Sequence, residues 1–358
     1  MEYQVVARRF RPQRFEDIVG QDAIVQTLKN AIAMNRIAHA YLFSGPRGIG
    51  KTTIARIYAK ALNCKEGPTD KPCGVCPNCT EIAASSSLDV IEIDGASNRG
   101  IDHIRDLREN VKYSPAASRY KIYIIDEVHM LSNEAFNALL KTLEEPPPHV
   151  KFFFATTEQN KILPTILSRC QKFELRRITA KDVVGRLAMI AKNDKIQIDD
   201  ESLAAVARAG LGSMRDAESI LEQMISYCGK KITYEKIAEV LGIVQDDTNF
   251  EVAAAVRAED VGALLKIVDR IAGEGKDFAR FLNGLTGHFR SLLVLKIAKD
   301  DGSLLDIPKD TFKKYQQQEK EFGEEELCAL TDLCSRAELD IRQAVSVRVT
   351  VEMALIKM

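Results

Sequence analysis

The feature that most constrains this chain is a glycine-rich octapeptide, Gly45-Pro46-Arg47-Gly48-Ile49-Gly50-Lys51-Thr52. It matches the pattern G-x-x-x-x-G-K-[ST] and lies between an expected strand and an expected helix, which is the context that this phosphate-binding pattern requires. Glycines let the backbone wrap closely, so that successive N–H groups point at phosphate oxygens, and the following helix adds its positive N-terminal end. The pattern predicts a nucleotide site that extends to Thr53, with Lys51 on the β and γ phosphates and the Thr52 hydroxyl on Mg²⁺. A chance glycine-rich turn is the alternative, which the flanking strand and helix disfavour.

Two adjacent acids predict the second half of this site. The apolar run 122–125 ends in Asp126 and Glu127. We expect Asp126 to hold Mg²⁺ through water and Glu127 to polarise an attacking water, because positioning and charge neutralisation supply most of the catalysis of phosphoryl transfer. A nucleotide kinase would not need the second acid, so the pair favours hydrolysis. The alternative is an acidic strand end that only caps the next helix.

Residues 1–177 alternate strand-like apolar runs with amphipathic helical stretches, the pattern of a parallel α/β sheet. A helix that carries Phe136, Leu139 and Leu143 on one face is expected to end at Pro146. Nearly continuous apolar runs are typical of strands covered on both faces. Strands are predicted at residues 39–44, 88–93, 120–125 and 150–156.

The pattern changes at about residue 178, after which helical periodicity dominates. A break near residues 242–247 starts a further all-helical region. We therefore predict three domains, because 358 residues are too many for one ordinary core. They are residues 1–177, 178–242 and 243–358. Four short helices are expected in the second domain, at residues 179–193, 200–209, 213–227 and 233–241.

The charge balance limits the possible partners. The formal net charge is −1 with 28% charged residues, which excludes a generally polycationic nucleic-acid coat but leaves room for a local basic strip. No run of about 18 apolar residues occurs, so no membrane span is expected. The N-terminus lacks the basic and apolar segments of a signal peptide, and we expect the protein in the cytoplasm.

Four of the eight cysteines, Cys64, Cys73, Cys76 and Cys79, are clustered with the spacing C-x8-C-x2-C-x2-C. In a reducing compartment such clustering favours a metal over disulfides. Four thiolates suit tetrahedral Zn²⁺ in a structural site. An iron–sulfur cluster and free thiols are the alternatives, although the ferredoxin pattern expects another cysteine at position 83, which is Ala83.

Further polar residues follow the P-loop in an order that suggests they belong to the same nucleotide site. Thr156 and Thr157 end a predicted strand, Arg169 follows shortly after, and Arg215 lies in the helical second region. Each arginine taken alone is more often a solvated surface charge. For His129, beside the two acids, we expect a packing or hydrogen-bonding role.

On these residues the chain resembles the AAA+ ATPases and, within them, the gamma/tau clamp-loader subunits of bacterial DNA polymerase III. The zinc insertion separates that branch from most AAA+ proteins. The resemblance implies an α/β P-loop domain with a parallel sheet and a zinc module at residues 64–79, a small helical lid and an all-α oligomerisation domain. The resembling segments are residues 7–12 and 15–21, the octapeptide at 45–52, the cysteine cluster, and residues 126–131, 136–147 and 166–170.

The resemblance also implies residue roles. Lys51 with Thr52 is similar to the Walker A pair, Asp126 with Glu127 to the Walker B pair, and Thr157 to the sensor 1 position.

Three roles concern arginines and the base. Arg215 resembles the sensor 2 arginine of the lid. Arg169 resembles an arginine finger that reaches the site of a neighbouring subunit, which would make hydrolysis depend on assembly. Arg11 and Val19 resemble the pocket for adenine and ribose.

The family implies a motor that uses ATP and Mg²⁺ to load a sliding clamp onto primed DNA, within a ring-like hetero-oligomer of clamp-loader subunits. Contacts with the DNA backbone, and no sequence-specific reading, are expected from Ser97, Asn98, Arg99 and Arg105. A solvated polar helix is the alternative for these residues. Two other functions stay open: a structural arm that lacks catalysis, and another AAA+ motor such as a branch-migration helicase.

Overall fold

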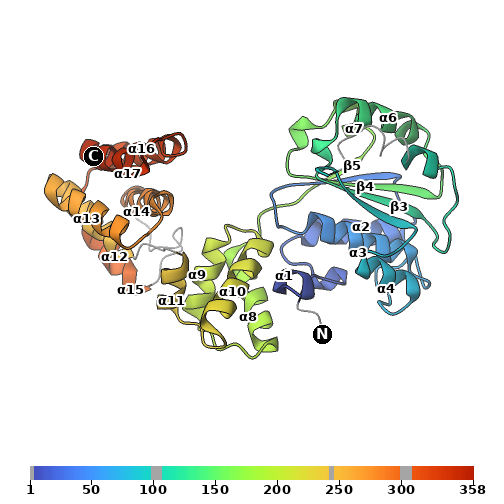
Figure 1. The fold of residues 1–358 in the computed structure, drawn as a ribbon, viewed down its shortest axis with the longest axis horizontal. Coiled ribbons are helices and arrows are strands. Elements are labelled where there is room, and N and C mark those ends of the chain that lie inside the picture. Colours follow the sequence, from blue (N-terminus) through green and yellow to red (C-terminus); the bar gives the residue numbers. More distant parts are fainter. Residues whose placement is uncertain (1–3, 98–106, 242–245, 299–308) are drawn as a thin grey trace. The chain divides into compact units, whose positions relative to one another are not determined.

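The computed structural model describes residues 4–97, 107–241, 246–298 and 309–358 of the chain (Figure 1). The chain divides into two compact units, Met1–Ile232 and Thr233–Met358.

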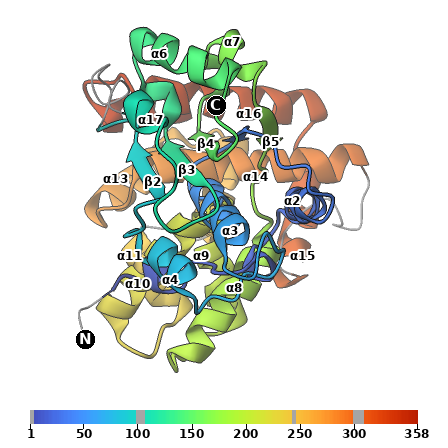
Figure 2. The ribbon, with the colours of Figure 1, turned by 90° about the vertical axis from the view of Figure 1, so that its right-hand side faces the viewer.

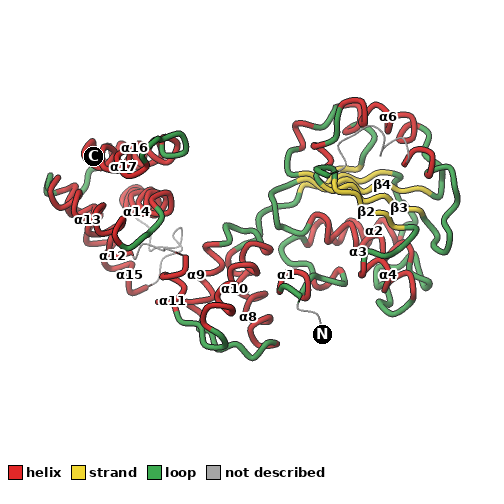
Figure 3. The backbone as a smooth tube through the Cα atoms, viewed as in Figure 1, coloured by secondary structure: helices red, strands yellow, loops and turns green. Residues whose placement is uncertain are grey.

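A five-stranded parallel sheet forms the centre of the first unit (Figure 3). The strand order is β2-β3-β4-β1-β5. Four strands lie where the sequence predicts them, and the edge strand β5 was not predicted. Their bounds are β1 Ala40–Ser44, β2 Val90–Asp94, β3 Lys121–Asp126, β4 Val150–Thr156 and β5 Gln171–Glu174.

Helices cover both faces of this sheet (Figure 1). Tyr41, Phe43 and Phe153 pack in the hydrophobic core on one face, together with α2 and α3. Phe152 and Phe154 face the opposite way and pack against α6. This double cover explains the continuous apolar runs of β1, β3 and β4. The helices on the first face are α2 (Asp22–Ala33), α3 (Lys51–Asn63) and α4 (Pro77–Ala84), and those on the second are α6 (Asn133–Glu144) and α7 (Pro164–Leu167).

A helical lid completes the first unit. Its helices are α8 (Ala180–Asn193), α9 (Asp200–Ala209) and α10 (Met214–Cys228), all close to the predicted bounds. Each begins at a side chain that accepts a hydrogen bond from a backbone N–H three residues later, namely Thr179, Asp199 and Ser213. A short N-terminal helix, α1 (Val6–Arg9), packs against α10 of this lid.

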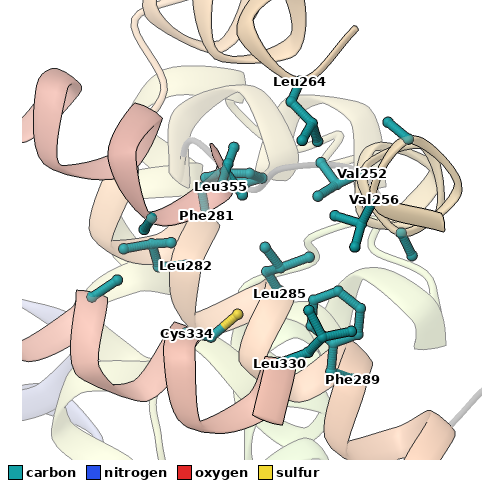
Figure 4. Close-up of a cluster of buried hydrophobic side chains, with 14 of the residues drawn as sticks. Val252, Val256, Leu264, Phe281, Leu282, Leu285, Phe289, Leu330, Cys334 and Leu355 are labelled. Atoms are coloured by element: carbon teal, nitrogen blue, oxygen red, sulfur yellow. The ribbon is translucent and has the colours of Figure 1, made fainter. Parts of the chain in front are cut away.

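The second unit is all-helical in its described part. Around α14 (Phe278–Ala298) lie α12 (Asp246–Arg257), α13 (Val261–Gly273), α16 (Glu324–Asp340) and α17 (Val347–Lys357), with α11 (Tyr234–Leu241) and α15 (Lys309–Gln318) completing the unit. Figure 4 shows its core, in which Leu282 and Leu285 of α14 meet Cys334 of α16 and Val252 of α12. The division of the chain into three domains at residues 177 and 242 stays a prediction.

Among the described residues, no helix is both long enough and apolar enough to span a membrane.

Candidate functional site

A cavity of about 820 Å³ lies in the first unit, where the P-loop, the ends of β2 and β3, the N-terminal segment and the lid meet. All residues from Arg47 to Thr53 line this cavity, together with Asp126 and Glu127. Arg11, Val19 and Arg215, predicted from the resemblance, line it as well. The structure therefore brings most of the expected nucleotide residues to one place.

The P-loop takes backbone conformations that favour glycine. Gly45, Gly48 and Gly50 all have positive φ angles, of 138°, 74° and 102°. Gly50 is the N-cap of α3, so Lys51 is its first residue and the positive end of the helix faces the cavity. A Cβ on Gly45 would lie 2.5 Å from the carbonyl oxygen of Leu175, so the loop also needs glycine there for space.

The Lys51 side chain is folded against its own loop. It is buried, and its Nζ donates to the carbonyl oxygens of Gly45 at 2.9 Å and Pro46 at 2.8 Å. Burial lowers the pKa of Lys51, although the carboxylates of Glu127 and Asp126 oppose that shift. Gly45 and Pro46 thus hold the ammonium group through their carbonyls and do not line the cavity themselves.

Thr52 and Asp126 form the expected metal-binding pair. The Thr52 hydroxyl donates to Oδ2 of Asp126 at 2.7 Å, although 74 residues separate them. The parallel register places Asp94, at the end of β2, beside Asp126 at the end of β3. Hydroxyl and carboxylate oxygens are the ligands that Mg²⁺ prefers, so this corner fits a nucleotide-bound magnesium ion.

The Glu127 carboxylate is held by residues at the end of β4. Thr157 donates to its Oε2 from the backbone N–H at 3.2 Å and from the hydroxyl at 3.0 Å. Glu127 has φ 45°, a strained conformation for a residue with a side chain. Its orientation is therefore set by the neighbouring strand.

His129 adds to this arrangement. Its Nδ1 lies 3.0 Å from the Thr156 hydroxyl and 3.3 Å from Oε2 of Glu127, and its Nε2 lies 3.4 Å from Glu158. The histidine side chain is buried, and these contacts agree with the hydrogen-bonding role expected for it.

Arg215 reaches the P-loop from the lid. It is the second residue of α10, and its backbone N–H donates to the Gly48 carbonyl at 3.2 Å. The lid therefore touches the phosphate loop directly.

Arg169 lies outside this cavity. Its guanidinium group is paired with Glu144 at 2.6 Å and donates to the Thr165 carbonyl, also at 2.6 Å. It does not reach its own chain's site, which is what a residue acting on a neighbour requires.

Several lining residues were missed at the sequence level. Arg8, Arg56 and Arg186 bring positive charge to the cavity, and Glu218 and Glu222 bring carboxylates from α10. Arg8 lies in the resembling segment 7–12 but was given no role, and no motif marks the other four, because a charged residue on an amphipathic helix usually points to solvent.

The four clustered cysteines come together as predicted. Their sulfur atoms all lie within 4.8 Å of one another. Cys64 follows the last residue of α3, and Cys79 lies in the first turn of α4, which packs beside α3 (Figure 2). Backbone N–H groups of Cys73 and Cys76 donate to the sulfurs of Cys64 and Cys73, each at 3.4 Å.

The geometry fits a tetrahedral metal. Sulfur atoms at Zn–S distances of about 2.3 Å lie roughly 3.8 Å apart in a tetrahedron, and Sγ of Cys64 lies 3.6 Å from Sγ of Cys73. Burial opposes ionisation of Cys76, but hydrogen bonds from the backbone of Lys65 and Cys79 lower the pKa of its thiol to about 7. The donor set therefore matches a structural zinc site.

Of the residues expected at DNA, only Ser97 is described. Its hydroxyl donates to Asp94 at 2.6 Å. Asn98, Arg99 and Arg105 lie outside the described residues, so their role stays a prediction.

The arrangement of sheet and lid recurs in solved structures. A single-residue variant of RuvB from Thermotoga maritima superposes with a TM-score of 0.51 and 18% identity, over 86% of this chain and 90% of that one. The RuvB Holliday junction branch migration motor of the same organism gives 0.50 and 19%, over 69% and 79%. At this identity the likeness concerns the fold, which is that of the AAA+ proteins.

Three family models match successive parts of the chain. DNA polymerase III, delta subunit, matches residues 20–179. DNA polymerase III clamp loader subunit, ATPase lid domain, matches 182–230. DNA polymerase III subunits gamma and tau domain III matches 232–358.

Curated relatives give the same result. DNA polymerase III subunit gamma of Buchnera aphidicola is 44% identical over 282 residues, 79% of this chain and 78% of that protein. DNA polymerase III subunit tau of Bacillus subtilis is 44% identical over 359 residues, and that of Escherichia coli 43% over 298. The chain spans 63% of the length of the Bacillus subtilis protein and 46% of that of the Escherichia coli protein. The chain belongs to the family of gamma and tau subunits of DNA polymerase III.

Proposed function

We propose that this chain is an ATP-hydrolysing motor subunit of a bacterial clamp loader, which couples ATP binding and hydrolysis to the loading of a sliding clamp onto primed DNA. The observation that carries the proposal is a set of catalytic residues gathered at one cavity: Lys51 of the P-loop, the Thr52–Asp126 pair, and Glu127 oriented by Thr157. A structural arm of the same assembly would have no use for this set.

The chemistry follows from the positions of the side chains. When nucleotide binds, Lys51 would exchange its two carbonyl acceptors for oxygens of the β and γ phosphates. This exchange is favourable because hydrogen bonds between an ammonium group and a phosphate anion are stronger than those to neutral carbonyls. Thr52 and Asp126 would hold Mg²⁺, which when bound would neutralise charge that develops on the phosphates. Glu127 orients the attacking water, and Arg215 contacts nucleotide from the lid.

Arg169 is proposed to act in trans. Its distance from its own cavity leaves the finger role to a neighbouring subunit's site, and the exposed pair with Glu144 costs little to break. Hydrolysis would then require assembly into the hetero-oligomer.

The cysteine cluster is proposed to hold one structural Zn²⁺ through Cys64, Cys73, Cys76 and Cys79. The four sulfurs would fill all four positions of a tetrahedral zinc ion, so no position would be open for catalysis. The proposed location is the cytoplasm, and the proposed partners are other clamp-loader subunits, the clamp and primer-template DNA. Ser97, Asn98, Arg99 and Arg105 remain the candidates for backbone contacts with the DNA.

The test is the ATPase rate of the chain alone, then with partner subunits, and then with clamp and primed DNA. A rate that rises at each addition supports the proposal. No turnover in the full mixture would favour the structural arm, and turnover indifferent to clamp and primed DNA would favour another AAA+ motor.

A further inference from the structure

The N-terminal segment of the chain forms one wall of the cavity, and polar contacts anchor it to the lid. The backbone N–H of Val6 donates to Oε2 of Glu222 at 3.1 Å, and Arg9 pairs with Asp194. Val6 is itself buried. The first turn of the chain is therefore bound to the lid helices α10 and α8, and not to the sheet.

A buried charge pair makes the next contact. Arg186 of α8 donates from Nη2 to the carbonyl oxygen of Phe10, and its Nε lies 4.0 Å from Oε1 of Glu218 on α10. Only 11% of the Arg186 side chain and 7% of the Glu218 side chain are exposed. Both line the cavity, and no step of the proposed hydrolysis uses them. Burying an arginine together with a carboxyl group is costly, so such a pair calls for an explanation beyond stability.

The segment is fixed again three residues later, this time to the P-loop helix. Lys60 of α3 donates from Nζ to the backbone carbonyl of Gln13 at 2.7 Å and to its side chain at 2.8 Å. Lys60 is 3% exposed and lies on the same helix as Lys51. Residues 11 and 12 thus bridge an anchor on the lid and an anchor on the P-loop helix.

Arg11 lies in this bridge, and it is held among other cations. Burial lowers the pKa of Arg11, and Arg56, Arg215 and Arg8 lower it further, against the opposing effect of Glu92. A guanidinium group so placed favours a polyanion, and its position depends on the carbonyl of the residue before it.

We propose that Arg186 and Glu218 are positioning residues for the nucleotide: by holding the Phe10 carbonyl they fix Arg11 in the cavity, so that nucleotide affinity depends on the lid through the N-terminal segment. Arg186 makes the contact, and Glu218 orients Arg186. This inference rests on the proposed nucleotide binding.

The experiment measures the affinity of the full chain for Mg²⁺-ADP by calorimetric titration, with the thermal midpoint of each variant recorded alongside. Arg186→Met keeps an unbranched but shorter and uncharged side chain and removes the hydrogen bond, so affinity should fall about tenfold, the size of one hydrogen bond to a charged group. Arg186→Lys keeps a hydrogen-bond donor and should therefore retain part of the Mg²⁺-ADP affinity that Arg186→Met loses. Glu218→Gln should weaken binding less than Arg186→Met.

A double variant separates positioning from stability. Arg186→Met with Glu218→Leu replaces a buried ion pair by apolar side chains, an exchange that is often neutral or stabilising. It should restore the thermal midpoint and leave the affinity low. If affinity recovers together with stability, the pair is only structural and the inference is wrong.

Two controls delimit the result. Arg336→Met removes an exposed pair with Asp332 in the second unit and should leave Mg²⁺-ADP affinity unchanged. Wild-type protein that binds no Mg²⁺-ADP or Mg²⁺-ATP overturns the proposed function and the inference together. Wild-type binding matched by a folded Arg186→Met variant overturns the inference alone.

Discussion

Thr157 donates twice to a single oxygen of Glu127, from its backbone N–H and from its hydroxyl. The carboxylate that should orient the attacking water is therefore aimed by the end of the adjacent strand. Thr157→Val keeps the shape and the backbone donor but removes the hydroxyl. We expect hydrolysis to fall about tenfold, because one of two orienting hydrogen bonds is lost, with nucleotide affinity nearly unchanged. Hydrolysis is measured as phosphate release. Thr27→Val, which removes a hydroxyl from the exposed side of α2, is the matched control and should leave it unchanged.

Lys51→Ala should abolish nucleotide binding or turnover. The side chain is buried at the floor of the P-loop, and no other cation in the described structure occupies that position. Equilibrium binding and phosphate release measure the effect, with the exposed Lys181→Ala in the lid as the control. Normal turnover would show that the site assignment is wrong.

Arg169→Ala should have little effect on stability, since its pair with Glu144 is partly exposed and such pairs contribute about 0–1 kcal/mol. In the assembled complex hydrolysis should fall by roughly three orders of magnitude, while binding by the isolated chain persists. Lys29→Ala breaks a comparable pair with Glu16 and should leave both stability and hydrolysis nearly unchanged. Loss of binding by the isolated chain would contradict the role in trans.

The stability of the first unit should depend on pH through Glu218. Burial raises the pKa of Glu218 to about 7, against the attraction of Arg186 from α8 and Arg11 from the N-terminal segment. The pair distance of 4.0 Å is long, which is why the attraction does not prevail. The folded chain thus keeps this proton where the unfolded chain has lost it, so the contribution is complete below about pH 4.5 and is lost as the pH rises through about 7.

A rise of the Glu218 pKa from 4.5 to about 7 changes the free energy of unfolding by about 3 kcal/mol between the two ends of this pH range. Urea unfolding of wild type and Glu218→Gln at about pH 5 and about pH 8 measures it. The variant should gain stability relative to wild type as the pH rises. Parallel profiles for the two proteins would contradict the assignment.

Metal analysis should give about one zinc per chain. Cys79→Ser should lose the metal, because the buried Cys79 sulfur lies within reach of the other three. Cys328→Ser is the control, since Cys328 is exposed and lies in the second unit. A brown, iron-containing preparation would contradict zinc.

The parts of the fold that were predictable share one physical origin. Strands β1, β3 and β4 contain nearly continuous apolar runs because helices cover both faces of the sheet, and the helices of the lid carry both an apolar stripe and a cap. Strand β5 escaped prediction because it lies at the sheet edge, where only Phe173 of its residues is buried. Its sequence has neither alternation nor a continuous apolar run.

The predictable part of the site is the part that contacts phosphate and metal, where the chemistry demands particular residue types at short spacing. Arg186 and Glu218 could not be found in this way. Their burial arises from the docking of α1 on the lid, a contact between segments about 180 residues apart. Arg169 is a different case, since its proposed partner belongs to another subunit.

Gly48 carries one further consequence. A Cβ there would lie 2.0 Å from the Ser213 hydroxyl, which caps α10 by accepting from the Asp216 N–H. A side chain at position 48 would displace that hydroxyl, and the cap is worth about 1 kcal/mol. Across evolution, positions 48 and 213 should therefore change together or stay fixed, so the lid as well as the nucleotide limits which residues the P-loop can carry.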